Sequence, residues 1–335
     1  MNNLPTLSTP LVSIVIPIFK IDKYIVQCID SAISQTYKNI EILCIDDSGA
    51  DNLPSELSSY LKSESRLKII HHKENLGAGP ARNTGISVSQ GDYIYFLDAD
   101  DWIEPKAIEN LVVKACQDDS DIVIGSAFAF PDNKSENLKN ISLSVNKWLK
   151  LSYVPGVVSG VMFYKAIGQI PCVVWGRLFR STFLKSNKLT FIQKKIRYED
   201  NGFHIKCMAC EPSVSFCDDQ SYKYRIRSHS VMNFGANNIN IREKELHIRL
   251  SIEDAINYIN THKHTDDYVQ MVRDAYWYCF ANKIFLIRFY WGKYCKVLKV
   301  GKFSLLKQDY RNNKLRLRIL GIPIWRWNLT DTKSD

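Results

Sequence analysis

Apolar runs alternate with stretches of helical periodicity through the first part of this 335-residue chain. Short unbroken apolar runs are typical of strands that are buried on both faces of a sheet. Between two of these runs, Ile25, Ile29 and Ile33 repeat at the spacing of one helix face. Strands are therefore predicted at residues 11–19, 40–46, 67–71, 93–97 and 121–130, and helices at 22–33, 51–64, 77–88 and 105–117. Strand alternating with helix predicts an α/β fold with an open, mostly parallel sheet flanked by helices.

Beyond Pro131 the pattern is less regular. Residues 132–146 are polar, so a loop is expected there. Residues 215–227 alternate in polarity and predict a further strand, and residues 241–260 and 266–290 have the periodicity of helices. The C-terminal part of the chain is accordingly expected to be a helical extension.

The composition is that of an ordinary globular protein, with 45% hydrophobic and 24% charged residues. The first apolar run, residues 11–19, contains Pro17 and has no basic segment before it, so no signal peptide is expected. The most apolar long stretch, residues 276–291, is interrupted by Lys283 and Arg288, which argues against a transmembrane helix. Nine cysteines without a framework pattern suggest a reduced, cytoplasmic setting.

The net charge of +9 is concentrated near the C-terminus. Residues 286–326 contain eleven Lys or Arg and one acid, Asp309, so this segment carries +10 and the rest of the chain −1. Aromatic residues accompany the basic ones, a combination that suits the surface of an anionic membrane. We expect peripheral attachment to the cytoplasmic face of the membrane. The alternative is a packed extension with a solvated basic face, and no nucleic-acid-binding module is recognisable.

Carboxylates follow two of the predicted strands directly. Asp46 and Asp47 end one strand, and Asp98, Asp100 and Asp101 follow another. In open parallel sheets ligands bind at the carboxyl ends of strands, and Mg²⁺ or Mn²⁺ prefers oxygen ligands. A site for a nucleotide and a divalent cation is one interpretation of the pattern. A solvated Asp turn that caps the next helix is the other, and Asp101 is the expected cap.

Four motifs, in the same order, resemble those of family 2 glycosyltransferases. They are Val15–Phe19, Ile45–Gly49, Asn75–Gly85 and Phe96–Asp101. One departure is at Ser48-Gly49, where the family more often has Gly-Ser. The resemblance implies a GT-A fold that binds a nucleotide-diphospho-sugar and inverts the anomeric carbon in a single displacement.

The resemblance also implies roles for individual residues. Those expected to contact the nucleotide-sugar are Pro17, Phe19, Asp47, Arg82 and Asp98, the first three around the base and Asp98 at the ribose or sugar. Asp100 is the expected ligand of Mn²⁺ or Mg²⁺. Tyr198-Glu199-Asp200 resembles the family's E-D motif, which makes Asp200 the expected catalytic base and Glu199 an aid to acceptor positioning. The alternative for Asp200 is a helix cap.

Two further segments carry a resemblance. Trp175–Arg180 resembles a segment of bacterial surface-polysaccharide transferases, and Tyr222–Ser230 resembles the Y-x-Y-R…S segment of family 2. Trp175 is expected to stack on an acceptor sugar, with a buried structural Trp as the alternative. Arg225, Arg227 or His229 is expected to reach the diphosphate or the acceptor from a closing loop. The implied organisation is a GT-A domain over 1–235, with a nucleotide-sugar half at 11–130 and an acceptor half at 131–235, followed by the helical, basic and aromatic extension at 236–335.

The predicted function is transfer of a hexose from a UDP-sugar to a hydroxyl group of a glycan or lipid-linked acceptor. The resemblance places this reaction in the synthesis of bacterial surface polysaccharide, of the lipopolysaccharide or lipooligosaccharide type. Two alternatives stay open. One is a sugar nucleotidyltransferase, and the other is a glycosyltransferase-like protein that binds without catalysis.

Overall fold

The computed structural model describes residues 9–20, 23–49, 55–133, 135–150, 157–159, 173–227 and 241–262, and five strands between 287 and 328. One nine-stranded sheet organises the chain up to residue 226, with strand order β3-β2-β1-β4-β8-β6-β9-β5 and β7 paired to β9. Its strands are β1 (Val12–Ile18), β2 (Ile40–Asp46), β3 (Leu67–His71), β4 (Tyr93–Phe96), β5 (Trp102–Ile103), β6 (Ile122–Pro131), β7 (Val158–Ser159), β8 (Arg177–Arg180) and β9 (Ser213–Ile226).

The five strands predicted in the first half are all present, and four of them, β1–β4, form the parallel part of the sheet. β1 pairs in parallel with β2 and β4, and β2 pairs in parallel with β3. Every residue of β2 and β4 is buried, including Glu41 of β2, whose carboxylate accepts the Ser13 hydroxyl at 2.6 Å. The carboxyl ends of these strands therefore meet at one edge of the sheet, where Asp46 and Asp98 end or follow them.

The second half makes the sheet mixed. β8 is antiparallel to both β4 and β6, whereas β6 and β9 are parallel. The long strand β9 also pairs with the short β5, Trp102 opposite Lys223. This pairing brings the C-terminal part of β9 beside the loop that follows β4.

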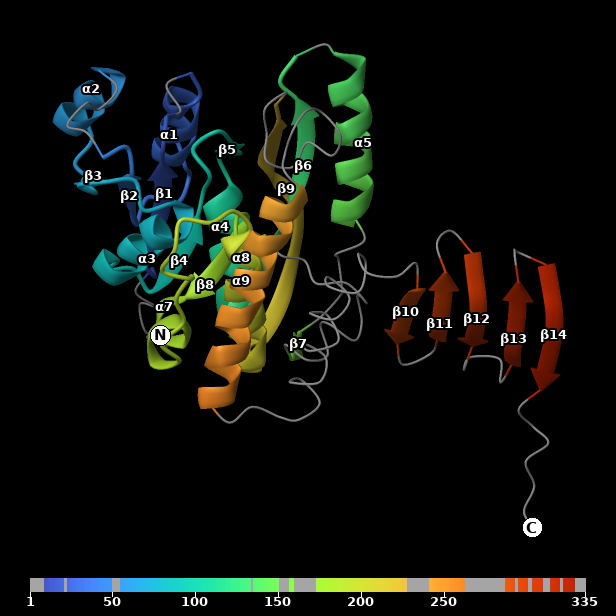
Figure 1. The fold of residues 1–335 in the computed structure, drawn as a ribbon. Helices are drawn as coiled ribbons and strands as arrows, with labels where there is room; N and C mark the ends of the chain where they lie inside the picture. The colour runs from blue at the N-terminus through green and yellow to red at the C-terminus, as the bar shows by residue number, and fades with distance from the viewer. Residues whose placement is uncertain are drawn as a thin grey trace, which may run out of the picture.

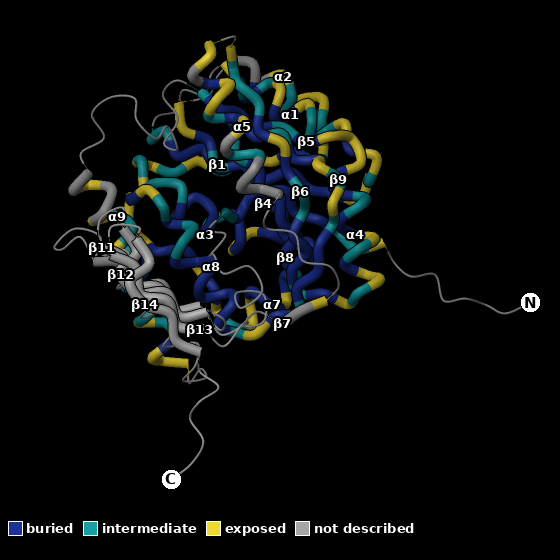
Figure 2. The backbone as a smooth tube through the Cα atoms, turned by 90° about the vertical axis from the view of Figure 1, so that its right-hand side faces the viewer, coloured by how far each residue is buried: buried dark blue, intermediate teal, exposed yellow. Residues whose placement is uncertain are grey.

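Helices cover both faces of the sheet (Figure 1). They are α1 (Ile25–Ile33), α2 (Ser55–Ser63), α3 (Ala78–Val88), α4 (Ala107–Asp118), α5 (Glu136–Lys150), α7 (Ser181–Ser186), α8 (Glu199–Ala209) and α9 (Ile241–Thr261). One apolar cluster joins the sheet to α1, α2, α4 and α5, and a second joins it to α3, α7, α8 and α9. Figure 2 shows β4 and β8 buried between these layers.

The loop expected at 132–146 is a helix instead. α5 spans Glu136–Lys150, and Leu138, Ile141 and Val145 pack against the core. These apolar positions lie three and four residues apart, which is the spacing of a helix face. Because the polar residues between them outnumber the apolar ones, the composition of the segment concealed its period.

Among the described residues, the expected C-terminal extension is helical only at its start. Most of the helix predicted at 266–290 lies outside the described residues. The predicted helix at 241–260 is α9, but the segment 287–328 forms strands: β10 (Ile287–Gly292), β11 (Cys295–Val300), β12 (Phe303–Asp309), β13 (Lys314–Ile319) and β14 (Ile322–Asn328). They pair antiparallel in chain order. Basic and apolar residues alternate in sequences such as Lys314-Leu-Arg-Leu-Arg-Ile319, and a period of two is that of a strand.

Candidate active site

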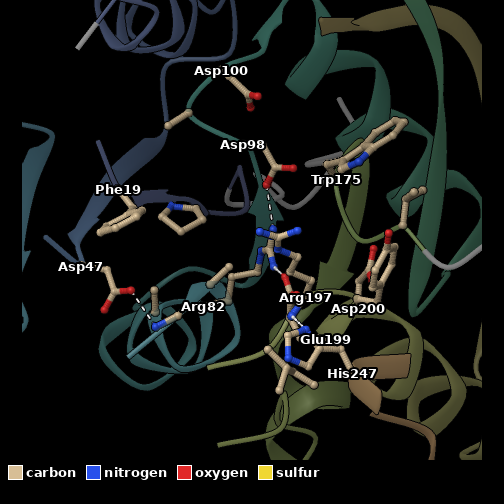
Figure 3. A pocket seen from close by; sticks show the side chains of 18 of the residues that line it. Phe19, Asp47, Arg82, Asp98, Asp100, Trp175, Arg197, Glu199, Asp200 and His247 are labelled. Carbon is tan, nitrogen blue, oxygen red and sulfur yellow. Dashed lines mark hydrogen bonds and ion pairs between the residues drawn. The ribbon is translucent and has the colours of Figure 1, made fainter. Parts of the chain in front are cut away.

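The loops after the parallel strands, together with the start of α8, enclose a cavity of about 1220 Å³. Its lining includes most of the residues singled out in the sequence (Figure 3): Pro17, Phe19, Asp47, Arg82, Asp98, Asp100, Trp175, Glu199 and Asp200. The fold thus brings six separate segments of the chain to one site. A cavity of this size is ample for a nucleotide-sugar and part of a second substrate.

Asp47, at the end of β2, is held by three donors. Its Oδ1 accepts the backbone N–H of Leu76 at 2.8 Å and the Nδ1–H of His72 at 2.8 Å, and its Oδ2 accepts the N–H of Gly77 at 2.7 Å. His72 Nε2 lies 2.9 Å from the hydroxyl of Thr84. A neutral ring satisfies both contacts, because Nδ1 donates while Nε2 accepts.

His72 is a site residue that the sequence reasoning missed. His72 could have been found from the ends of the two strands, because β2 and β3 pair in parallel with Asp46 opposite His71. Two strands that end in Asp-Asp and His-His therefore place two carboxylate–imidazole pairs side by side, and His71 indeed contacts Asp46 at 2.9 Å.

The glycine-rich turn before α3 makes room for the loop that leads to α8. Gly77 has a φ of +98°, and a Cβ there would lie 2.9 Å from the Cα of Lys195. A Cβ on Gly79 would lie 3.0 Å from the carbonyl oxygen of Ile192. Side chains at these positions would push the loop away, so the glycines allow Lys195 to approach Phe19, with its Nζ 6.0 Å from the ring centre.

Arg82 joins the two halves of the site. The residue is buried, its Nη2 donates to Asp98 Oδ1 at 2.8 Å, and its Nη1 pairs with Glu199. Figure 3 shows the guanidinium between these two carboxylates. One cation between two acids leaves a net charge of −1, so this part of the cavity favours a cationic group or a metal ion rather than a bare phosphate.

Asp101 does not cap the next helix, contrary to expectation. α4 begins at Ala107, and the Asp101 carboxylate instead accepts the Tyr222 hydroxyl at 2.7 Å and the Arg225 N–H at 2.7 Å. Its pKa is raised well above the ordinary range, first by burial and then by the charges of Asp100 and Asp98. Asp101 therefore fastens the loop after β4 to β9.

Arg225 was expected on the acceptor side, and the structure corrects this. Its guanidinium lies 4.5 Å from the ring centre of Tyr24, 4.8 Å from that of Trp102 and 5.1 Å from that of Phe130. Its Nε donates to the carbonyl oxygen of Asp100 at 2.8 Å. Arg225 is buried and is not part of the cavity lining, so it holds the loop that follows β4 from the side away from the cavity.

Trp175 lines the cavity although only 8% of its surface is exposed. Its indole stacks on Tyr222, with ring centres 4.5 Å apart, and on Tyr224, with ring centres 5.1 Å apart. The structure therefore shows Trp175 as a packed core residue at the cavity wall, and stacking on an acceptor sugar stays a prediction. His229, the remaining acceptor-side prediction, lies outside the described residues.

Asp200 is in the first turn of α8, next to Glu199. Tyr198, just before the helix, has a φ of +63°, a left-handed conformation that is uncommon for a residue other than Gly and turns the chain into the helix. The pKa of Asp200 is raised to about 8, mainly by burial and then by the charge of Glu199. A carboxylate with such a pKa is a stronger proton acceptor than an ordinary aspartate.

Comparison with known proteins identifies the family. Residues 13–170 match the model of "Glycosyl transferase family 2". Glycosyltransferase GlyG of Streptococcus pneumoniae is 36% identical over 227 residues, which are 66% of this chain and 73% of that protein. The chain belongs to glycosyltransferase family 2. Putative glycosyltransferase EpsH of Bacillus subtilis is 31% identical over 229 residues, and the match covers 68% of this chain and 64% of EpsH.

Solved structures support the GT-A-like fold of this family 2 chain. S. aureus TarS 1-349 in complex with UDP-GlcNAc superposes with a TM-score of 0.63 at 14% identity, covering 82% of this chain and 73% of that one. The mannosyltransferase PcManGT of Pyrobaculum calidifontis, in complex with GDP-Man and Mn²⁺, has a TM-score of 0.57 at 15% identity, covering 81% and 70%.

The residues of this family 2 site are compatible with a divalent ion that takes some of its ligands from the protein and the others from a bound substrate. Among the described residues, no group of three or more His, Cys, Asp or Glu could hold a metal alone. Asp100 pairs with Arg227, and its pKa is raised, first by burial and also by Asp98, while Arg227 opposes the shift. Mg²⁺ commonly takes only one or two carboxylates and completes its shell with phosphate oxygens and water. Asp100 can supply one such ligand once Arg227 releases it.

Proposed function

We propose that this protein transfers a hexose from a UDP-sugar to a hydroxyl group of an acceptor and inverts the anomeric carbon. The observation that carries the proposal is the position of Asp200, a carboxyl with a pKa of about 8, in the same cavity as Asp98 and Asp100. The complex of TarS with UDP-GlcNAc supports a UDP-sugar as donor, although TarS shares only the fold with this chain.

In this mechanism an acceptor hydroxyl attacks the anomeric carbon from the face opposite the diphosphate. The new C–O bond forms as the bond to the UDP oxygen breaks, and Asp200 takes the proton of the hydroxyl. Glu199, whose carboxylate is held by Arg82, orients the acceptor. Pro17, Phe19 and Asp47 surround the base, and Asp98 contacts the ribose or the sugar.

Asp100 would hold Mn²⁺ or Mg²⁺, which, when bound, neutralises the negative charge of the departing diphosphate. The PcManGT complex supports the choice of metal, because that GT-A neighbour binds Mn²⁺. Arg227 contacts Asp100, so it is close enough to pair with the diphosphate instead.

We further propose that the product is a bacterial surface polysaccharide built on a glycan or lipid-linked acceptor. The similarity to EpsH and GlyG supports a bacterial glycosyltransferase. None of the described helices is long and apolar enough to cross a membrane. Access to a lipid-linked acceptor would therefore rest on the basic C-terminal segment, as a peripheral attachment to the inner face of the cell membrane.

A panel of UDP-glucose, UDP-galactose, UDP-GlcNAc and UDP-GalNAc tests the donor. Metal-dependent release of UDP from one of them is expected, and EDTA or Asp100→Asn should abolish it. Formation of a nucleotide-sugar from UTP and a sugar phosphate would instead favour a nucleotidyltransferase. Binding of UDP without any turnover would favour a protein that binds without catalysis.

A further inference from the structure

α9 carries polar residues toward the cavity, and the motifs discussed above do not include them. Glu243, His247 and Ser251 follow one another at intervals of four residues, so they lie along one side of the helix. Glu243 and His247 line the same cavity as Asp200, whereas Ser251 is fully buried. This row of side chains thus runs from the core to the rim of the site.

The loop before Asp200 fixes the orientation of His247. The backbone N–H of Arg197 donates to His247 Nδ1 at 3.2 Å. Since Nδ1 accepts this bond, a neutral ring carries its proton on Nε2. The Nε2–H is therefore the group that His247 offers to a ligand in the cavity.

α9 is held firmly against α8, so His247 keeps its position relative to Asp200. The N–H of Gly202 donates to the Ser251 hydroxyl at 2.8 Å, and Lys206 pairs with Asp254 at 2.7 Å. A Cβ on Gly202 would lie only 2.1 Å from the carbonyl oxygen of Ser251. Such close packing is the rigid support that a binding residue needs.

The cavity has a different character on the side of Trp175. Its lining there includes Ile141 and Val145 of α5, together with Val173 and Trp175. In Figure 3 Asp200 lies between Trp175 and His247. A sugar ring has one apolar C–H face and a rim of hydroxyl groups, so it matches a site with one aromatic and one polar wall.

The charge of the polar wall argues against an anionic ligand. Glu243 contributes one negative charge and Arg197 one positive charge, and both line the cavity. Lys195 belongs to the opposite, nucleotide end, beside Phe19. A phosphate recognition site would need an excess of cationic donors, which this wall does not have.

We propose that Glu243 and His247 bind the hydroxyl groups of a neutral sugar residue of the acceptor, whose C–H face lies against Trp175. The Glu243 carboxylate accepts a hydrogen bond from one hydroxyl, and His247 Nε2–H donates to another. The attacking hydroxyl is then held beside Asp200. This inference rests on the proposed function and adds the chemical class of the acceptor.

Saturation-transfer NMR on the full-length chain with UDP and Mg²⁺ tests the proposal, using methyl glycosides of glucose, galactose and N-acetylglucosamine as probes. Wild type is expected to bind at least one of them. Glu243→Ala and His247→Asn should each weaken that binding by about tenfold or more. Asn keeps an oxygen that can accept the Arg197 N–H, so His247→Asn removes the Nε2–H with little effect on the loop.

Glu253→Ala is the matched control, because Glu253 is an acid on the same helix that pairs with Arg249 at 3.1 Å and does not line the cavity. It should leave glycoside binding unchanged, and all three variants should bind UDP as wild type does. Equal glycoside binding by wild type and the two site variants would overturn the inference. Two results with wild type would also overturn it. One is binding of UDP but of none of the glycosides, and the other is binding of glycerol phosphate, added as an anionic probe, but of none of the glycosides. Failure of wild type to bind UDP would instead overturn the proposed function itself.

Discussion

At the scale of single residues, Asp200 gives the most direct prediction. A base must be ionised to accept a proton, and the pKa of Asp200 is about 8 because of its burial and the neighbouring Glu199. The rate constant kcat/KM should therefore rise with pH and level off above about pH 8. Asp200→Asn should lower the transfer rate by about a hundredfold or more and abolish this rise. A variant that keeps the wild-type pH profile would contradict the role of Asp200 as base.

The same residue should make stability depend on pH. Its folded pKa of about 8 exceeds the ordinary value of 3.8, so the folded state binds this proton more tightly than the unfolded state. Stability is then lost as pH rises between these values, by up to about 1.4 kcal/mol per pH unit from this group alone. The melting temperature of Asp200→Asn relative to wild type should accordingly increase over this range. A constant difference would show that the carboxyl is not perturbed.

His72 gives a second prediction at this scale, because it donates to Asp47, the proposed contact of the base. His72→Gln removes the Nδ1 donor and should weaken UDP binding by about tenfold. His72→Asn keeps a donor near Nδ1 and should weaken it less. Calorimetric titration with UDP measures the effect, with His71→Gln as the control, since the His71 side chain is 43% exposed and contacts Asp46 instead. Equal losses for both glutamine variants would count against the positioning role.

At the scale of elements, β9 holds the loop that follows β4. Arg225 contributes a backbone N–H to Asp101 and its Nε to the carbonyl oxygen of Asp100. The planar guanidinium of Arg225 makes the contact with the Asp100 carbonyl oxygen and also packs among the rings of Tyr24, Trp102 and Phe130. Arg225→Lys removes this group. We expect a loss of about 1–3 kcal/mol of stability together with weaker binding of Mn²⁺ in the presence of UDP.

Denaturant unfolding and electron paramagnetic resonance of Mn²⁺ measure these two effects. Arg249→Lys is a suitable control, because Arg249 and its partner Glu253 are 44% and 39% exposed. Exposed pairs contribute little, so this variant should lose less than about 1 kcal/mol and bind Mn²⁺ normally. If both substitutions have the same effect on Mn²⁺ binding, β9 does not position the Asp98–Asp101 loop.

At the scale of the whole molecule, the charge distribution predicts where the protein acts. Residues 286–326 carry eleven basic residues and one acid, and this segment contains most of the five-stranded sheet β10–β14. The chain should sediment with phosphatidylglycerol vesicles at low salt and be released at high salt. Phosphatidylcholine vesicles should bind much less of it.

Two variants test whether the C-terminal segment and its positive charges are responsible for vesicle binding. Truncation after Asp274 removes all five strands and should abolish vesicle binding. Replacing Lys314, Arg316 and Arg318 by Gln removes three charges from β13 and should weaken the binding. Binding by the truncated chain that equals binding by the full chain would exclude the C-terminal segment as the attachment site.

The parallel half of the sheet and the residues gathered at its edge follow from the amino-acid sequence alone. Unbroken apolar runs define buried strands, and parallel strands place their carboxyl ends together, so Asp47, Asp98 and Asp100 had to be neighbours. The family motifs added Arg82 and Asp200. The structure brings these five residues to one cavity, because each lies on a short segment whose conformation is set locally. Their binding and catalytic roles stay predictions.

The partner of each charged group depends instead on how distant parts of the chain pack together. Arg82 pairs with Glu199, 117 residues away, and Asp101 accepts from Arg225, 124 residues away. No local pattern specifies such pairs, because they depend on how α8 and β9 pack against the sheet. The strands at 287–328, expected as part of a helical extension, depended on cross-strand pairing in the same way. The wall formed by α9 beside Asp200 likewise exists only through the packing of α9 on α8, since Glu243 and His247 are distant in sequence from every family motif.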